Sequence, residues 1–298
     1  LAIWDAAGVD TIVATNDANI TKGNGSGLFS VIDLREGAGS QIGFLSETWA
    51  EPYYSQDPNG FGWRSAWPNI YIAYGAVVEN VVGSNGKDMI TGNGVNNKIT
   101  GGSGDDVING GAEVDTAVFS GNRGQYTLSK TADGYLLQDT ISNRDGADTL
   151  ASIERLQFTN NRVALDLAPT DSAGQAVLFI GVLAPNLVAS PGTVGLILNY
   201  VDGGLSMQQL NQLAVDSGLV HNLAGGNSNA NVARLAFKNV EGVPAAPDMI
   251  DLLVGFMDGR SANFTQSEFL TAVANLEANQ VNVDLVGLAQ TGIEYAFG

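Results

Sequence analysis

Glycines and oxygen-bearing side chains recur every nine residues between Val82 and Val118, a spacing that could hold metal ions. Four successive steps share a glycine at the first position, Asp or Asn at the sixth and an apolar residue at the eighth. The first positions are Gly83, Gly92, Gly101 and Gly110, the sixth are Asp88, Asn97, Asp106 and Asp115, and the eighth are Ile90, Ile99, Ile108 and Ala117. Calcium collects six to eight carboxylate, amide and carbonyl oxygens with loose geometry. The spacing therefore predicts a calcium-binding segment.

The glycines predict tight turns, because glycine adopts positive φ without a Cβ clash. We expect six residues of each step to form the turn and three to form a strand whose eighth-position side chain points inward. Two steps then complete one turn of a coil, so loops one and three stack on one side and loops two and four on the other. This arrangement is a parallel β-roll, the fold typical of G-G-x-G-x-D-x-U-x repeats. A flexible Gly/Asn-rich linker would fit the composition but not the in-phase isoleucines.

Two calcium sites between stacked loops follow from this arrangement. The first set joins Gly83, Asn85 and Asp88 to Gly102, Gly104 and Asp106, and the second joins Gly92, Gly94 and Asn97 to Gly111, Glu113 and Asp115. In the second set, the neutral Asn97 costs the charge that an aspartate would supply at the sixth position.

Three segments outside the repeats resemble the C-terminal domain of the serralysins. Residues 1–11 are similar to its W-D-x-G-G-x-D-T opening, 31–37 to its next strand and 72–80 to the entry into its repeats. Serralysins are secreted bacterial zinc endopeptidases of the metzincin class, with a catalytic domain followed by a calcium β-roll. The resemblance implies a further calcium held by Asp5, Asp10 and Glu79. Ala7 replaces the family's second glycine, and the ligand loop that precedes this point in the family is absent.

No catalytic zinc site is legible in the chain. A metzincin needs H-E-x-x-H-x-x-G-x-x-H, because three imidazoles hold zinc and the glutamate deprotonates its water. The chain has one histidine, His221, which we interpret as a surface or helix-end residue. We therefore expect no zinc and no enzyme activity here. The opening has neither Met nor a signal peptide, so we expect an upstream catalytic domain as partner.

Residues 47–74 are rich in aromatic side chains and prolines and interrupt the family pattern. The segment predicts either a cap on the open edge of the roll or a platform for a protein or glycan partner. The candidate platform residues are Trp49, Tyr53, Tyr54, Trp63 and Trp67.

The chain is predicted to have three parts, a β + α organisation. Residues 1–120 form the β-roll domain (repeats 83–118), 121–168 a β-hairpin extension and 169–298 an all-α helical domain. Within the extension, the Asp145/Gly146/Asp148 cluster predicts either another calcium or simply a turn. In the helical part, residues 176–202 align without gaps on 232–258, indicating a bundle of two related units. Its end, 282–295, resembles uncharacterised helical domains appended to repeat-in-toxin (RTX) surface proteins.

Composition narrows the function classes. A net charge of −18 argues against nucleic-acid partners, and the absence of cysteine excludes disulfides. No apolar run reaches the roughly 18 residues of a membrane span. The sequence predicts an extracellular, secreted chain whose calcium-triggered folding assists export through a type I secretion apparatus. The alternative is a cell-surface or S-layer-associated RTX adhesion module.

Overall fold

The computed structural model describes residues 2–3, 8–14, 29–44 and 70–296. Its contacts divide the chain into two compact units, Leu1–Asn161 and Arg162–Gly298. The contacts thus group the segment predicted as a β extension with the repeats as far as Asn161. Asp5 and the aromatic residues Trp49, Tyr53, Tyr54, Trp63 and Trp67 lie outside the described residues.

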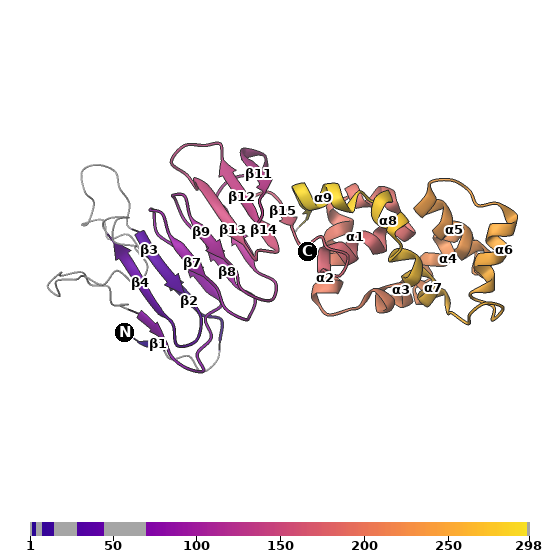
Figure 1. Cartoon of the computed structure of the whole chain (residues 1–298), viewed down its shortest axis with the longest axis horizontal. Helices are drawn as coiled ribbons and strands as arrows, with labels where there is room; N and C mark the ends of the chain where they lie inside the picture. Colours follow the sequence, from indigo (N-terminus) through magenta and orange to yellow (C-terminus); the bar gives the residue numbers. More distant parts are fainter. Residues whose placement is uncertain (1, 4–7, 15–28, 45–69, 297–298) are drawn as a thin grey trace. The chain divides into compact units, whose positions relative to one another are not determined.

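Unit 1 is built from two sheets. The first has the strand order β1-β5-β4-β3-β7-β9-β13-β12-β11, and the second runs β14-β10-β8-β6-β2 within this unit (Figure 1). The strands are β1 (Ala2–Ile3), β2 (Thr11–Val13), β3 (Phe29–Asp33), β4 (Gly39–Phe44), β5 (Ile70–Ile72), β6 (Asn80–Val82), β7 (Met89–Thr91), β8 (Lys98–Thr100), β9 (Val107–Asn109), β10 (Thr116–Val118), β11 (Tyr126–Lys130), β12 (Tyr135–Asp139), β13 (Ala147–Ala151) and β14 (Arg155–Gln157), with a short 3-10 helix at Arg123–Gln125.

Successive strands of the repeats alternate between the two sheets. β7 pairs in parallel with β9, while β6, β8 and β10 pair in parallel in the other sheet. Strands two steps apart are thus neighbours, with Ile90 opposite Ile108 and Val81 opposite Ile99. The nine-residue period produces this alternation, because each glycine-headed turn carries the chain across to the other sheet.

The eighth-position side chains form the core between the two sheets. Each is at most 6% exposed, and the series continues beyond the four repeats in both sheets. One column holds Ile32, Ile90, Ile108 and Leu150, and the other holds Ile12, Val81, Ile99, Ala117 and Leu156. Removing such apolar surface from water is worth about 25 cal/mol per Å². The ladder of isoleucines predicted from the sequence is confirmed and is longer than predicted.

The hairpin predicted around Asp133-Gly134 is present as β11 and β12. β12 also pairs antiparallel with β13, which in turn pairs in parallel with β9. Three aromatic rings, of Phe119, Tyr126 and Phe158, pack together with centroids 5.1–5.7 Å apart.

Unit 2 is mainly helical. Its helices are α1 (Ser172–Leu183), α2 (Pro191–Asp202), α3 (Met207–Asp216), α4 (Leu219–Ala224), α5 (Asn229–Glu241), α6 (Pro247–Gly255), α7 (Gln266–Ala274), α8 (Glu277–Asn282) and α9 (Leu285–Thr291), with a 3-10 turn at Pro185–Ala189 and an antiparallel pair β15 (Arg162–Ala164) and β16 (Ile293–Tyr295). The prediction of an all-α segment is wrong at β16, where the alternation of Ile293, Glu294 and Tyr295 forms a strand with burial pattern buried, exposed, buried.

The internal sequence repeat corresponds to matching helices. Pro191 and Pro247 begin α2 and α6, and capping boxes at Ser206 and Thr265 start α3 and α7. α1 packs against α5, and α3 packs against α7. Nearly every residue of α1 is buried, which is typical of a helix surrounded by others. Within the described part of the chain, no helix is both long and apolar enough to cross a membrane.

Candidate calcium-binding turns

The turns of the repeats stack backbone to backbone. The Gly83 amide donates to the Thr100 carbonyl and the Gly92 amide to the Asn109 carbonyl, both at 2.8 Å. A Cβ on Gly83 would lie 2.1 Å from the Gly101 oxygen, and one on Gly92 would lie 1.9 Å from the Gly110 oxygen. Only glycine allows this approach, so the first position of the repeat is fixed by the stacking itself.

Sixth-position residues form a hydrogen-bonded column along the first sheet. The Ser30 amide donates to Asp88 Oδ1 (2.6 Å), and the Asp88 amide donates to Asp106 Oδ1 (2.8 Å). The Asp106 amide in turn donates to Asp148 Oδ1 (2.8 Å). Each carboxylate therefore reaches the backbone of the preceding turn of the coil.

A second column runs along the other sheet. The Asn97 amide donates to Asp115 Oδ1 (2.7 Å), and the Asp115 amide donates to Glu154 Oε2 (2.8 Å). At the other end the Asp10 amide donates to Glu79 Oε2 (2.8 Å). Asn97 departs from the pattern, because its Nδ2 donates to the carbonyls of Val78 and Glu79.

The aspartates of the columns are buried. Asp88, Asp106, Asp115 and Asp148 are each at most 2% exposed. Burial is the main cause that raises the pKa of Asp106 to about 8, of Asp115 to about 7 and of Asp148 to about 9. Burial also raises the pKa of Asp88. Neighbouring carboxylates add to the shifts at Asp106, Asp115 and Asp148, so removal of these protons calls for a compensating cation.

The remaining carboxylate oxygens are suited to such a cation. Oδ2 of Asp106 and Oδ2 of Asp115 are buried and have no hydrogen-bond partner among the described residues. Asp115 Oδ2 and the Ser152 carbonyl lie 2.4 and 2.2 Å from the position that a Cβ on Gly110 would take, so two oxygens converge there. The donor set is therefore carboxylate and carbonyl oxygen, which suits calcium. Within the described ranges, no three His, Cys, Asp or Glu side chains form a group that could hold a metal ion.

The loops of both predicted ligand sets lie together in the structure. The loop of Gly83, Asn85 and Asp88 stacks on that of Gly102, Gly104 and Asp106, with Gly104 against Gly86. The loop of Gly92, Gly94 and Asn97 stacks on that of Gly111, Glu113 and Asp115. Asp10 and Glu79 are neighbours, whereas Asp5 is not described. Which of these residues bind an ion stays a prediction.

Sequence reasoning missed two members of the columns, Ser30 and Glu154, and named Asp148 only within a cluster that predicts either another calcium or a turn. Asp148 carried a signal, because Gly146, Asp148 and Leu150 occupy the fourth, sixth and eighth positions of a further step. No comparable sequence pattern marks Glu154. Its turn is shorter than the others, and the longer glutamate side chain spans the distance to the Asp115 amide.

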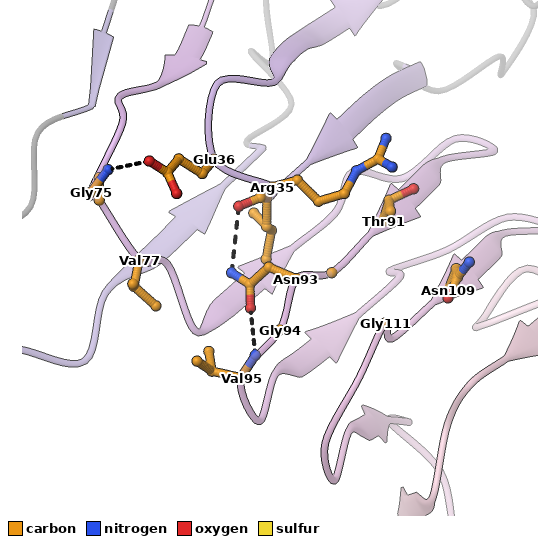
Figure 2. A pocket seen from close by; sticks show the side chains of 13 residues that line it. Arg35, Glu36, Gly75, Val77, Thr91, Asn93, Gly94, Val95, Asn109 and Gly111 are labelled. Atoms are coloured by element: carbon orange, nitrogen blue, oxygen red, sulfur yellow. Dashed lines mark hydrogen bonds between the residues drawn. The ribbon is translucent and has the colours of Figure 1, made fainter.

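A cavity of about 470 Å³ opens beside the second pair of turns. Its wall includes Gly92, Gly94 and Gly111 of the second predicted set. In Figure 2 Asn93 donates to the Leu34 carbonyl and accepts from the Val95 amide, and so ties two turns together. The cavity therefore lies directly against the second predicted set of turns.

Comparison with known proteins supports the calcium chemistry of the repeats. Residues 82–117 match the family model of the RTX calcium-binding nonapeptide repeat in four copies. This segment is therefore a run of RTX calcium-binding repeats. A search of curated proteins gave no match.

Among solved structures, the chain is similar to the extracellular lipase LipA from Serratia marcescens. The identity is 16% and the TM-score 0.16, over 29% of this chain and 18% of the lipase chain. The matched part thus spans less than a fifth of the lipase, and a score this low supports no statement about fold or activity here.

Proposed function

We propose that residues 1–161 form a calcium-filled β-roll that folds when calcium binds. The chain would then be the non-catalytic C-terminal region of a secreted, serralysin-like zinc metallopeptidase. One observation carries this proposal: sixth-position carboxylates stack in two columns while buried, and two of them retain a buried oxygen with no hydrogen-bond partner among the described residues. Calcium would supply the positive charge that such a column needs.

The mechanism is a folding switch. Where calcium is scarce, Asp88, Asp106 and Asp148 repel one another when ionised, and bringing them into the column is unfavourable. At 100 times its Kd, calcium would stabilise the folded state by about 2.7 kcal/mol per site. Several sites together approach the 5–15 kcal/mol that stabilises a typical domain. The chain would therefore stay unfolded for type I secretion and fold in extracellular calcium.

The parent enzyme would supply the catalysis from an upstream domain. The sequence has a single histidine, and His221 Nε2 lies 3.1 Å from Gln266 Oε1. One imidazole already engaged by an amide cannot supply the three imidazoles of a metzincin zinc site. The serralysin assignment is supported by the segments 1–11, 31–37 and 72–80. Their described parts include β1, the first residue of β2, the last three residues of β3, the last residue of β5 and the first residue of β6.

A second candidate is a cell-surface or S-layer-associated RTX binding module. The observation that favours it is unit 2, which has its own buried core of helices, foreign to ordinary serralysins. The sequence upstream of Leu1 discriminates between the two candidates. An H-E-x-x-H-x-x-G-x-x-H motif there would support the peptidase, and tandem repeats or sugar-binding modules would support the adhesin.

Calcium titration of the full chain tests the folding switch. Pulsed hydrogen exchange of peptides from residues 82–118, applied along a thermal ramp, reports the unfolding of unit 1. We expect calcium to raise the melting temperature, and Asp88→Ala with Asp106→Ala to remove most of that shift. The matched control, Asp202→Ala with Asp258→Ala in unit 2, should leave the shift intact. Equal shifts in both double variants would show that the sites are misplaced, and no shift in the unmodified chain would refute the switch.

A further inference from the structure

Residues 143–148 form an additional turn of the coil, beyond the segment that matches the RTX repeats. β13 follows this turn and pairs in parallel with β9, placing Leu150 opposite Ile108. Leu150 is 1% exposed and so takes the place of an eighth-position residue. A Cβ on Gly146 would lie 2.1 Å from the Gly104 oxygen, so the two turns are in backbone contact as the repeat loops are.

The polar contacts between these two turns repeat those of the predicted first site. The Asp106 amide donates to Asp148 Oδ1 at 2.8 Å, just as the Asp88 amide donates to Asp106 Oδ1 at 2.8 Å. The Ala147 amide donates to Asp105 Oδ1 at 2.8 Å, as the Val114 amide donates to Asn96 Oδ1 at 2.9 Å between turns of the second predicted set. Asp148 is thus a sixth-position residue by geometry, although no glycine heads its step.

We infer that loop 101–106 and turn 143–148 enclose a further calcium site, with Asp106 and Asp148 as its carboxylates. A second observation points to an ion: Asp106 is 1% exposed, and its Oδ2 lies inside loop 101–106 without a hydrogen-bond partner among the described residues. The inference rests on the proposed function, because both place calcium between stacked turns. It extends the ion column past the four matched repeats.

The surroundings of this site lack a neutralising side chain. The nearby guanidinium of Arg144 forms an ion pair with Asp139 at 2.6 Å. Within the described residues no lysine or arginine pairs with Asp106 or Asp148. Asp105 and Asp145 instead place further carboxylates near Asp106 and Asp148. A divalent cation, with twice the charge of a lysine or arginine side chain, therefore fits between these carboxylates.

Asp145, although close, has a different role. Its carboxylate accepts hydrogen bonds from the Ser120 amide (2.8 Å), the Ser120 hydroxyl (2.6 Å) and the Tyr126 hydroxyl. Both oxygens of this carboxylate therefore already have hydrogen-bond donors. We therefore assign Asp145 to holding the turn against residues 120–126, and only Asp148 to the ion.

Counting the calcium ions bound by the full chain tests this inference. Native mass spectrometry in calcium should show one ion fewer for Asp148→Asn than for the unmodified chain. The amide oxygen of asparagine can still accept from the Asp106 amide, so the contact between turns is retained. Asp133→Asn, in the exposed turn of the hairpin, is the matched control and should lose no ion.

The outcomes separate this inference from the proposed function. If Asp148→Asn keeps every ion while Asp88→Asn loses one, the further site is wrong and the repeats still bind calcium. If the unmodified chain binds none, both proposals fail. Should Asp148→Asn not fold, anomalous scattering from crystals of the unmodified chain in calcium decides. A peak between the Asp106 and Asp148 carboxylates supports the site, and peaks only at the repeat loops overturn it.

Discussion

Without calcium, unit 1 should become less stable as the pH rises from 5 to 7. Burial raises the pKa of Asp106 to about 8, of Asp115 to about 7 and of Asp148 to about 9, from an ordinary value of 3.8. Between 3.8 and these values the folded chain holds protons that the unfolded chain has lost. The free energy of unfolding therefore falls as the pH rises.

The size of the effect follows from linkage. Each carboxyl that stays protonated in the folded state and ionises in the unfolded state costs about 1.4 kcal/mol per pH unit. From pH 5 to 7 the loss is about 2.7 kcal/mol for one such carboxyl. A typical domain is stabilised by only 5–15 kcal/mol. The stability is fully present below pH 3.8 and is lost as the pH rises through the folded-state values of about 7 to 9.

Calcium should reverse this trend, because a carboxylate must lose its proton before it can bind the ion. The assay is thermal unfolding at pH 5, 6, 7 and 8, in buffer stripped of calcium by a chelating resin and again in millimolar calcium. Pulsed hydrogen exchange of peptides from residues 82–118 at each temperature follows unit 1, and circular dichroism at 222 nm follows the helices of unit 2. Asp148→Asn should reduce the pH dependence seen without calcium by the share of one carboxyl.

A specific result would refute the reasoning. If the calcium-free melting temperature of unit 1 stays constant or rises between pH 5 and 7, the carboxyls are not held protonated by burial. An equal pH dependence of the helical signal would also contradict the reasoning. In the described part of unit 2, hydrogen bonds lower the pKa values of Asp258 and Glu268, which gives no reason for stability to fall between pH 5 and 7.

Two further predictions concern single positions of the repeats. Gly92→Ala should reduce the calcium-dependent melting shift, because the new Cβ would lie 1.9 Å from the Gly110 oxygen, whereas Gly94→Ala, with nothing within 4 Å, should preserve it. An unchanged shift in Gly92→Ala would show that these turns need not stack closely. Asn97→Asp should bind calcium more tightly, by roughly 1 kcal/mol or about fivefold, since it adds a charge-assisted ligand. Titration calorimetry measures this, and unchanged affinity would place the second ion away from residue 97.

The sequence predicted the elements whose period is strict. Ile90, Ile99 and Ile108 recur every nine residues, and all three are buried between the two sheets. Successive strands alternate between these sheets, as expected. The prediction ended at Val118, where the spacing changes. Asp148 follows Asp106 after a hairpin, so a fixed-period search does not connect them, yet parallel pairing of β13 with β9 aligns them. Local periodicity in the sequence identifies the repeats. The end of the column of sixth-position carboxylates depends instead on which strands pair over long distances in the chain.

The sixth position explains why aspartate recurs there. One oxygen of Asp106 accepts the amide of the preceding turn, a task that any acceptor could perform. The other oxygen is buried with no hydrogen-bond partner among the described residues, and once the carboxyl is ionised a cation would offset its desolvation. Asn97 has a single acceptor oxygen, which already accepts from the Asn93 amide. The column through Asn97 therefore keeps its fold but has fewer oxygens for an ion, so calcium affinity should differ between the two sides of the coil.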